Sequence, residues 1–176
     1  MRQSAISYFA DMVLSPLLAV VLCGVALVNI TRLGFVQWLA AAFAGAAFWT
    51  LFEYAMHRVI YHHFPVFRGY HGAHHASPRA YIGAPPVVAT GAVFLIGFAP
   101  VAAFSPLTAN GVSVGMLLGY TVYALVHHAC HFWTPRRGTY LHRLRLHHAL
   151  HHHRSDEGNF GVTTPFWDHV FGTRIR

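Results

Sequence analysis

Four stretches of the chain are almost continuously apolar, and its polar residues gather in two longer segments. The apolar stretches cover residues 12–30, 36–56, 87–104 and 107–126. Each is close to the roughly 20 residues that a helix needs to cross the apolar core of a bilayer. The pattern therefore predicts an all-α integral membrane protein with about four transmembrane helices, formed as a single domain over residues 1–176.

The connections between these stretches are unequal in length. Residues 31–35 and 105–106 are short enough to join their flanking spans as two hairpins. The two long polar segments, 57–86 and 127–176, then lie on one side of the membrane together with both termini. We expect these segments to form a helical, histidine-rich cap.

The composition supports this interpretation and orients it. The chain is 55% hydrophobic and only 10% charged, against about 25% charged residues in a typical soluble domain. Its twelve basic residues are all arginine, and all except Arg32 fall on the side of the two polar segments. The positive-inside rule therefore places the termini and the cap in the cytoplasm. The net charge of +7 then indicates a lipid surface rather than nucleic acid as the partner.

All sixteen histidines lie in the polar segments, and their spacing repeats. The trios 71, 74, 75 and 148, 151, 152 have i, i+3, i+4 spacing, so we expect each trio to aim its three imidazoles at one point. His127 and His131 are one turn apart. His57 and His62 are five residues apart, or about 140° around an ideal α-helix, so a regular helix would not aim both at one ion. We expect either that the helix ends near His62 or that His62 serves a different metal.

This spacing selects ten candidate ligands, more than one ion can take, and so predicts two metal sites made almost entirely of nitrogen. Imidazole binds iron, zinc, copper or nickel, so the spacing does not name the metal. Where two histidines are adjacent, at 62/63, 127/128 and 147/148, the spacing does not decide which of the two is the ligand. The ten candidates are His57, His62, His71, His74, His75, His127, His131, His148, His151 and His152.

Two other residues lie close enough to the histidines in the sequence to be considered for a role at the metal sites. Glu53 lies one turn before His57 inside an apolar stretch, and we expect it to accept the ring N–H of a ligand histidine and so fix its tautomer. Cys130 lies between two candidate ligands, and a small packing residue is the favoured interpretation. No catalytic residue beyond the metal ligands is expected.

The order of the boxes, H-x-x-x-x-H, H-x-x-H-H, H-x-x-x-H and H-x-x-H-H, resembles the fatty acid hydroxylase/sterol desaturase superfamily of integral-membrane oxygenases. The resemblance covers roughly residues 53–173. The closing "NFGVTTPFWDHVFGT" and the "HHASPRAYIGAPP" after the second box are similar to the fatty acid 2-hydroxylase branch. The resemblance implies a membrane anchor capped by a dimetal centre held by the ten histidines.

The function that follows is hydroxylation of a lipid acyl chain, using dioxygen as co-substrate and two metal ions. Cleaving an unactivated C–H bond requires a redox metal, which favours iron, although zinc could be found in its place. No flavin or haem motif is visible, so the electrons should come from a separate donor of the ferredoxin or cytochrome type.

The substrate should enter between spans that pack closely through small residues, such as Ala41/Gly45 and Ala42/Ala46. Candidates for contacting its carboxyl group or headgroup are Arg136, Arg137, Arg143 and Arg145.

Four alternatives are weighed against this function. A carotenoid ring hydroxylase or a lipid desaturase would share a similar order and spacing of the histidine boxes. A metal carrier would need ionisable residues along the spans, and only Glu53 lies inside a predicted one. A zinc hydrolase is disfavoured because the chain has no H-E-x-x-H motif.

Overall fold

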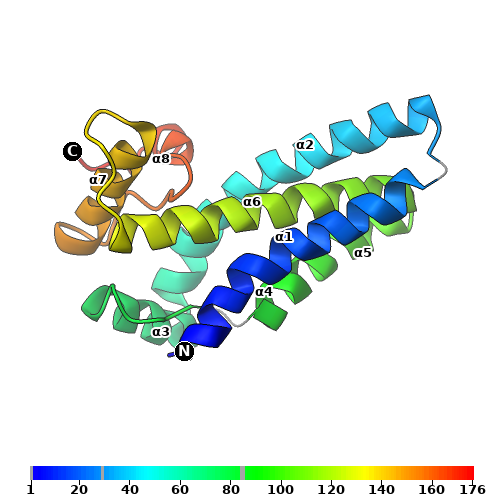
Figure 1. The fold of residues 1–176 in the computed structure, drawn as a ribbon. Helices are drawn as coiled ribbons and strands as arrows, with labels where there is room; N and C mark the ends of the chain where they lie inside the picture. Colours follow the sequence, from blue (N-terminus) through cyan, green and yellow to red (C-terminus); the bar gives the residue numbers. More distant parts are fainter. Residues whose placement is uncertain (1, 29, 84–85) are drawn as a thin grey trace. The chain divides into compact units, whose positions relative to one another are not determined.

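The structure is a computed structural model that describes residues 2–28, 30–83 and 86–176. Residues 29 and 84–85, which fall within the predicted first span and the predicted segment 57–86, lie outside the described residues. Over the described residues the chain is helical, with an isolated bridge between Arg2 and Ile82. The helices, drawn in Figure 1, are α1 (Ala5–Leu27), α2 (Arg32–Ala55), η1 (Met56–Tyr61), α3 (Pro65–Ala76), α4 (Pro86–Ala92), η2 (Val93–Phe98), α5 (Ala99–Ala102), α6 (Pro106–Phe132), α7 (Tyr140–His153) and α8 (Phe166–Val170).

The chain forms two compact units, which are described separately below. The apolar unit contains Gln3–Trp49 and Ala84–Thr121, and the histidine unit contains Met1–Arg2, Thr50–Gly83 and Val122–Arg176. The predicted all-α fold is confirmed for the described residues.

In the described part of the chain, three helices are long and apolar enough to cross a membrane: Ala5–Leu27, Arg32–Tyr61 and Pro106–Phe132. They correspond to the first, second and fourth predicted spans. The remaining predicted span, 87–104, is a shorter apolar segment over Val87–Ala102 whose middle is the π-helical turn η2. Large apolar side chains on α1 are exposed, as at Val20 and Val25, which suits a surface that faces lipid rather than water.

Within the apolar unit, small residues let helices approach to backbone contact. A methyl group added at Gly45 would overlap the backbone of Val112, and one added at Gly115 would overlap the carbonyl oxygen of Ala42. A side chain at Gly111 would lie 2.6 Å from the carbonyl oxygen of Trp38. The close contact predicted from the small-residue spacing is therefore present.

The apolar unit also buries a carboxyl group that the sequence interpretation had placed outside the spans. Helix α1 begins at Ala5, so Asp11 lies within it rather than before it, and its carboxylate accepts the hydroxyl of Tyr120. Glu53 is therefore not the only acid within an apolar helix, as had been expected from the predicted boundaries. Sequence hydropathy placed the start of the span too late because the first turns of α1 contain polar residues.

The histidine unit is built from helix ends and two further helices. The last turns of α2 continue into η1, and α3 follows with Pro65 in its first turn, where the missing N–H of proline costs nothing. Helix α7 begins at an N-cap in which the Thr139 hydroxyl accepts the N–H of His142 at 3.2 Å. These elements present the histidine boxes to one another.

Candidate metal centre

A π-helical turn changes the register of the first histidine pair. His57 lies inside η1 and His62 is its C-cap, and the two rings lie 5.4 Å apart between centroids. The segment is not a regular α-helix: its wider π-helical turn brings residues five apart toward one face. The helical element ends at Tyr61, just before His62, as one of the two expectations had it, whereas the expectation that His62 serves a different metal is not met. Both rings join the same group of histidines. Sequence spacing alone gave no signal for the π-turn.

The first histidine group gathers five rings from η1, α3 and α7. Their ligand nitrogens all lie within 4.8 Å of one another. The Nε2 atom of His71 lies 3.0 Å from those of both His57 and His75, and that of His75 lies 3.1 Å from that of His151. The members of the group are His57, His62, His71, His75 and His151.

The second histidine group gathers five rings from α3, α6 and α7, again with their ligand nitrogens within 4.8 Å of one another. The Nε2 atom of His131 lies 3.0 Å from that of His148 and 3.3 Å from that of His127. The members are His74, His127, His131, His148 and His152. The two groups together contain the ten histidines selected from the sequence.

The chemistry of these groups fits metal ions. Ring nitrogens of His62, His74 and His152 are buried without a hydrogen-bond partner, which is costly for a polar atom unless a ligand takes its lone pair. Burial, reinforced by the neighbouring imidazoles, lowers the pKa of His75 and of His151 to about 4 and that of His74 to about 3. The rings are therefore neutral at pH 7, the form that binds metal.

The structure separates the adjacent histidines that the sequence left undecided. His62 belongs to the first group, whereas His63 is exposed. His127 belongs to the second group, whereas His128 stacks on Phe132 with 4.4 Å between ring centroids.

A third adjacent pair is divided in the same way. His148 belongs to the second group, whereas the Nε2–H of His147 donates to the Oδ2 of Asp168 at 3.0 Å. The other histidines outside both groups are His142, His153 and His169. Cys130 is buried beside the second group but is not one of its members.

The segment 156–160 supports the first histidine group from outside. The Nδ1–H of His57 donates to the carbonyl of Phe160 at 2.6 Å, and that of His151 donates to the carbonyl of Gly158 at 2.7 Å. Since a carbonyl can only accept, each ring is held in the tautomer that leaves Nε2 free to bind an ion. A carboxylate oxygen of Asp156 lies 4.0 Å from the Nδ1 of His62.

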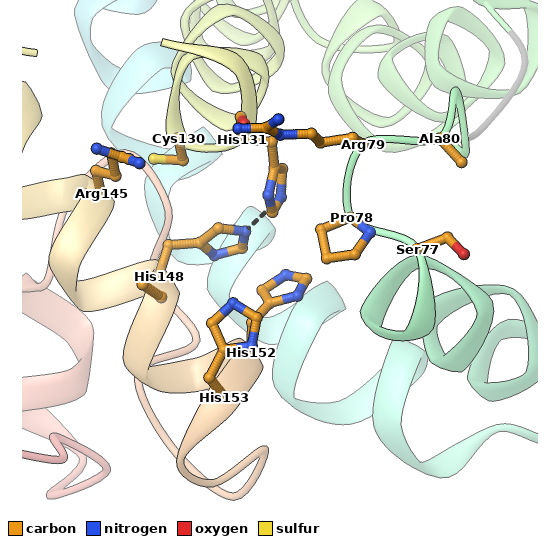
Figure 2. A pocket seen from close by; sticks show the side chains of 11 residues that line it. Ser77, Pro78, Arg79, Ala80, Cys130, His131, Arg145, His148, His152 and His153 are labelled. Carbon is orange, nitrogen blue, oxygen red and sulfur yellow. Dashed lines mark hydrogen bonds between the residues drawn. The ribbon is translucent and has the colours of Figure 1, made fainter. Parts of the chain in front are cut away.

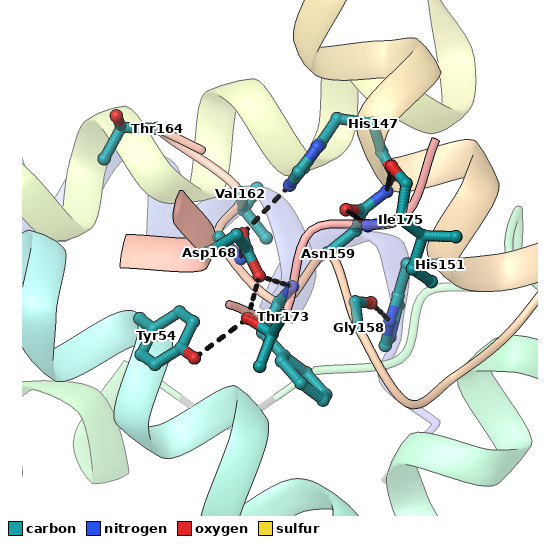
Figure 3. A network of polar contacts seen from close by, with 12 residues as sticks. Tyr54, His147, His151, Gly158, Asn159, Val162, Thr164, Asp168, Thr173 and Ile175 are labelled. Carbon is teal, nitrogen blue, oxygen red and sulfur yellow. Dashed lines mark hydrogen bonds and ion pairs between the residues drawn. The ribbon is translucent and has the colours of Figure 1, made fainter. Parts of the chain in front are cut away.

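The closing motif of the chain has a physical role that its sequence did not reveal. Figure 3 shows Asp168 at the centre of a polar network. Its carboxylate accepts the backbone N–H groups of Phe160 and Gly161, both at 2.9 Å, and the hydroxyl of Thr173 at 2.7 Å. Burial raises the pKa of this carboxyl, but the hydrogen bonds from His147 and the other donors outweigh it and lower the pKa below its usual value.

Asn159 completes this network. Its backbone has a positive φ of 57°, a conformation that asparagine tolerates better than most residues. Its side-chain amide donates to the carbonyl of His147 at 3.2 Å and accepts the N–H of Ile175 at 2.8 Å. The network fixes the loop that carries the two carbonyls facing His57 and His151.

Glu53 contacts the loop of the closing motif. Its Oε1 atom accepts the backbone N–H of Val162 at 3.1 Å and that of Thr163 at 2.8 Å. These bonds hold the same loop that presents the Phe160 carbonyl to His57. The carboxylate therefore acts on that ring through the loop.

A cavity of about 420 Å³ lies against the second histidine group. Figure 2 shows His131, His148 and His152 turned toward one another at its wall, with Cys130 and Arg145 on one side and Ser77 and Pro78 on the other. Of the four arginines proposed as headgroup contacts, Arg145 is the one that lines this cavity, and Arg79 lines it as well.

Known proteins share this fold and this sequence pattern. The profile described as fatty acid hydroxylase matches residues 42–173. Fatty acid 2-hydroxylase of Mus musculus is 34% identical over 143 residues, which cover 74% of this chain and 38% of the relative. Dihydroceramide fatty acyl 2-hydroxylase FAH2 of Arabidopsis thaliana is 32% identical over 143 residues, covering 73% of this chain and 58% of the relative. The chain belongs to the fatty acid hydroxylase family.

A solved structure confirms the architecture. The structure titled full-length scs7p, of which only the hydroxylase domain is visible, superposes with a TM-score of 0.83 at 26% identity. The match covers 97% of this chain and 67% of that one. Together with the long apolar helices, these relatives identify an integral membrane protein. The chain spans about 38% of the length of the mammalian relatives it matches.

Proposed function

We propose that the chain is a dioxygen-dependent hydroxylase of lipid acyl chains that holds two metal ions, one in each histidine group. The observation that carries this proposal is the convergence of ten buried or half-buried imidazoles into two groups, each with its ligand nitrogens within 4.8 Å of one another. Membership of the fatty acid hydroxylase family supports the same reaction.

The ten histidines are the proposed metal ligands, and the redox chemistry makes iron the proposed metal. The ions, when bound, would supply the dioxygen activation and C–H cleavage that amino-acid side chains cannot perform. One oxygen atom is inserted into the substrate and the other leaves as water, so two electrons and two protons are consumed. A separate ferredoxin- or cytochrome-type donor supplies the electrons.

The protein's own residues orient the ligand histidines and bind the substrate. The carbonyls of Gly158 and Phe160 hold His151 and His57 with Nε2 directed into the first group. Arg145, at the cavity beside the second group, is proposed to contact the carboxyl or amide end of the substrate. Relatives named fatty acid 2-hydroxylases favour the carbon next to that end as the position of attack. The arginine distribution along the chain supports a cytoplasmic histidine unit and cytoplasmic termini.

The test is lipid analysis of cells that lack an endogenous acyl hydroxylase and express this chain. We expect acyl chains that carry one added hydroxyl, with the oxygen drawn from isotopically heavy dioxygen rather than from water. His74→Ala, in the second group, should abolish the product, and His169→Ala, at an exposed position outside both groups, should retain it. Unlabelled product, or no hydroxylated lipid with a reductant supplied, would overturn the proposal.

A further inference from the structure

The two histidine groups differ in their surroundings, and we propose that this makes their metal positions unequal. The ion in the second group is exchangeable and open to small exogenous ligands through the adjoining cavity, whereas the ion in the first group is held by braced rings. This inference rests on the proposed function only in requiring two bound ions.

The first group is braced by one short segment of chain. Residues 156–160 provide outer contacts to three of its five rings: the carbonyls of Gly158 and Phe160 and the carboxylate of Asp156. The segment is itself held, because Asp168 accepts the N–H of Phe160, and the N–H of Asn159 donates to the carbonyl of Thr173 at 2.9 Å. Rings fixed in this way lose little freedom on binding an ion, and outer contacts of this kind commonly strengthen metal binding tenfold or more.

Three rings of the second group lack equivalent contacts among the described residues. The Nδ1 atoms of His74, His148 and His152 are buried without a hydrogen-bond partner among the described residues. Among the described residues, no hydrogen bond to these Nδ1 atoms selects a tautomer or resists rotation of the ring. Three of its five rings are therefore less well oriented toward an ion than His57 and His151 are in the first group.

The cavity adds a second, independent difference. It is lined by His131, His148 and His152 of the second group, and no member of the first group is among its lining residues in the described part of the chain. Its volume of about 420 Å³ is within the range of cavities that take small molecules. A ligand that enters it meets the second group alone.

The lining of the cavity indicates what enters. Arg79 and Arg145 supply positive charge, and Cys130, Ala149 and Pro78 supply small or apolar walls. No carboxylate is among the lining residues in the described part of the chain. This combination favours a small anion that can also donate a lone pair to an ion, a class that azide represents.

The first experiment uses the full chain in detergent, loaded with Co²⁺, whose absorption spectrum reports its ligands. Azide should perturb one of two bound ions. Ala149→Trp, which fills the cavity from α7, should weaken azide binding at least tenfold. Leu146→Trp is the matched control, because Leu146 is exposed on the same helix and outside the cavity lining, and it should bind azide as the wild type does. If Ala149→Trp does not retain two ions, Ala149→Leu takes its place.

The second experiment follows release of Co²⁺ to an excess of 1,10-phenanthroline. We expect two phases of equal amplitude, with the fast phase slowed by Ala149→Trp and unchanged in Leu146→Trp. Two ions released in one phase, or azide binding that is insensitive to Ala149→Trp, would overturn the inference and leave the proposed function standing. Fewer than two ions per chain before chelation would overturn both.

Discussion

The Nδ1 atom of His57 lies 2.6 Å from the carbonyl oxygen of Phe160, a residue 103 positions further along the chain. This bond joins a π-helical turn at the end of α2 to the loop of the closing motif. It requires the loop to hold its shape, and Asp168 is the residue that holds it, since its two carboxylate oxygens accept from Phe160, Gly161, Thr173 and His147. The closing motif therefore acts on the first histidine group without belonging to it.

Asp168→Asn should weaken the first metal position and the fold together. The amide must point a donor at one of the N–H groups that the carboxylate now accepts, and a buried mismatch of that kind costs about 1–3 kcal/mol. We expect a melting temperature lower by several degrees and loss of about one metal ion per chain, measured by thermal unfolding and elemental analysis. Glu157→Gln is the control, since Glu157 is exposed on the neighbouring surface and belongs to neither histidine group. Equal metal content in the two variants would contradict this role.

Paired substitutions at adjacent histidines test the ligand set. His62→Ala should lose one ion and at least 100-fold in hydroxylation, because it removes a member of the first group, whereas His63→Ala changes an exposed ring and should behave as the wild type. The same contrast is expected between His127→Ala and His128→Ala. Metal content and product formation are measured on the same preparations, and a larger loss in His63→Ala than in His62→Ala would reverse the assignment.

The sequence predicted the parts of the site that depend on α-helical periodicity. The trio at 71, 74 and 75 lies on one helix, α3, as predicted, but its rings do not converge on one point as expected: His71 and His75 belong to the first group and His74 to the second. The division arises because i+3 and i+4 positions lie on opposite sides of the first ring around the helix. Spacing gives the shared face, and only the packing of neighbouring helices decides which ion each ring approaches.

The parts that were missed depend on contacts between distant segments or on irregular backbone. The π-turn that brings His57 and His62 together leaves no mark in hydropathy. Asp168 and Asn159 were quoted as members of a motif, but their roles lie in hydrogen bonds to loop backbone that pairwise spacing does not reveal. Glu53 was correctly singled out as a buried acid, yet its Oε1 atom bonds backbone N–H groups of a loop 109 and 110 positions away.

Close packing in the apolar unit predicts a difference between two glycines. Gly115→Ala should destabilise the fold by about 1–3 kcal/mol, because the added methyl group overlaps the backbone of Ala42 and overpacking forces helices apart. Gly24→Ala, in α1 with nothing within 4 Å of the added carbon, should be neutral or slightly stabilising, as expected for glycine in an open helical position. Melting temperatures in detergent distinguish them, and equal values would contradict the packing described for Gly115.

The metal-free protein should lose stability as the pH falls below about 6.5. An unfolded histidine titrates near pH 6.5, whereas burial and the neighbouring imidazoles lower the pKa of His75 and of His151 to about 4 and that of His74 to about 3. Between the pKa of the unfolded histidines and the lower pKa values of the folded protein, the unfolded chain binds more protons than the folded one. The free energy of unfolding therefore decreases as the pH falls through this range. We expect the melting temperature to fall steadily from about pH 7 toward about pH 4, and more gently in His75→Asn, which removes one of the linked groups.

Bound Co²⁺ should reduce this pH dependence until the ion is released, since the ion occupies the nitrogens that protons would take. A melting temperature that rises or stays constant on acidification of the metal-free protein would show that these rings are not buried in their neutral form.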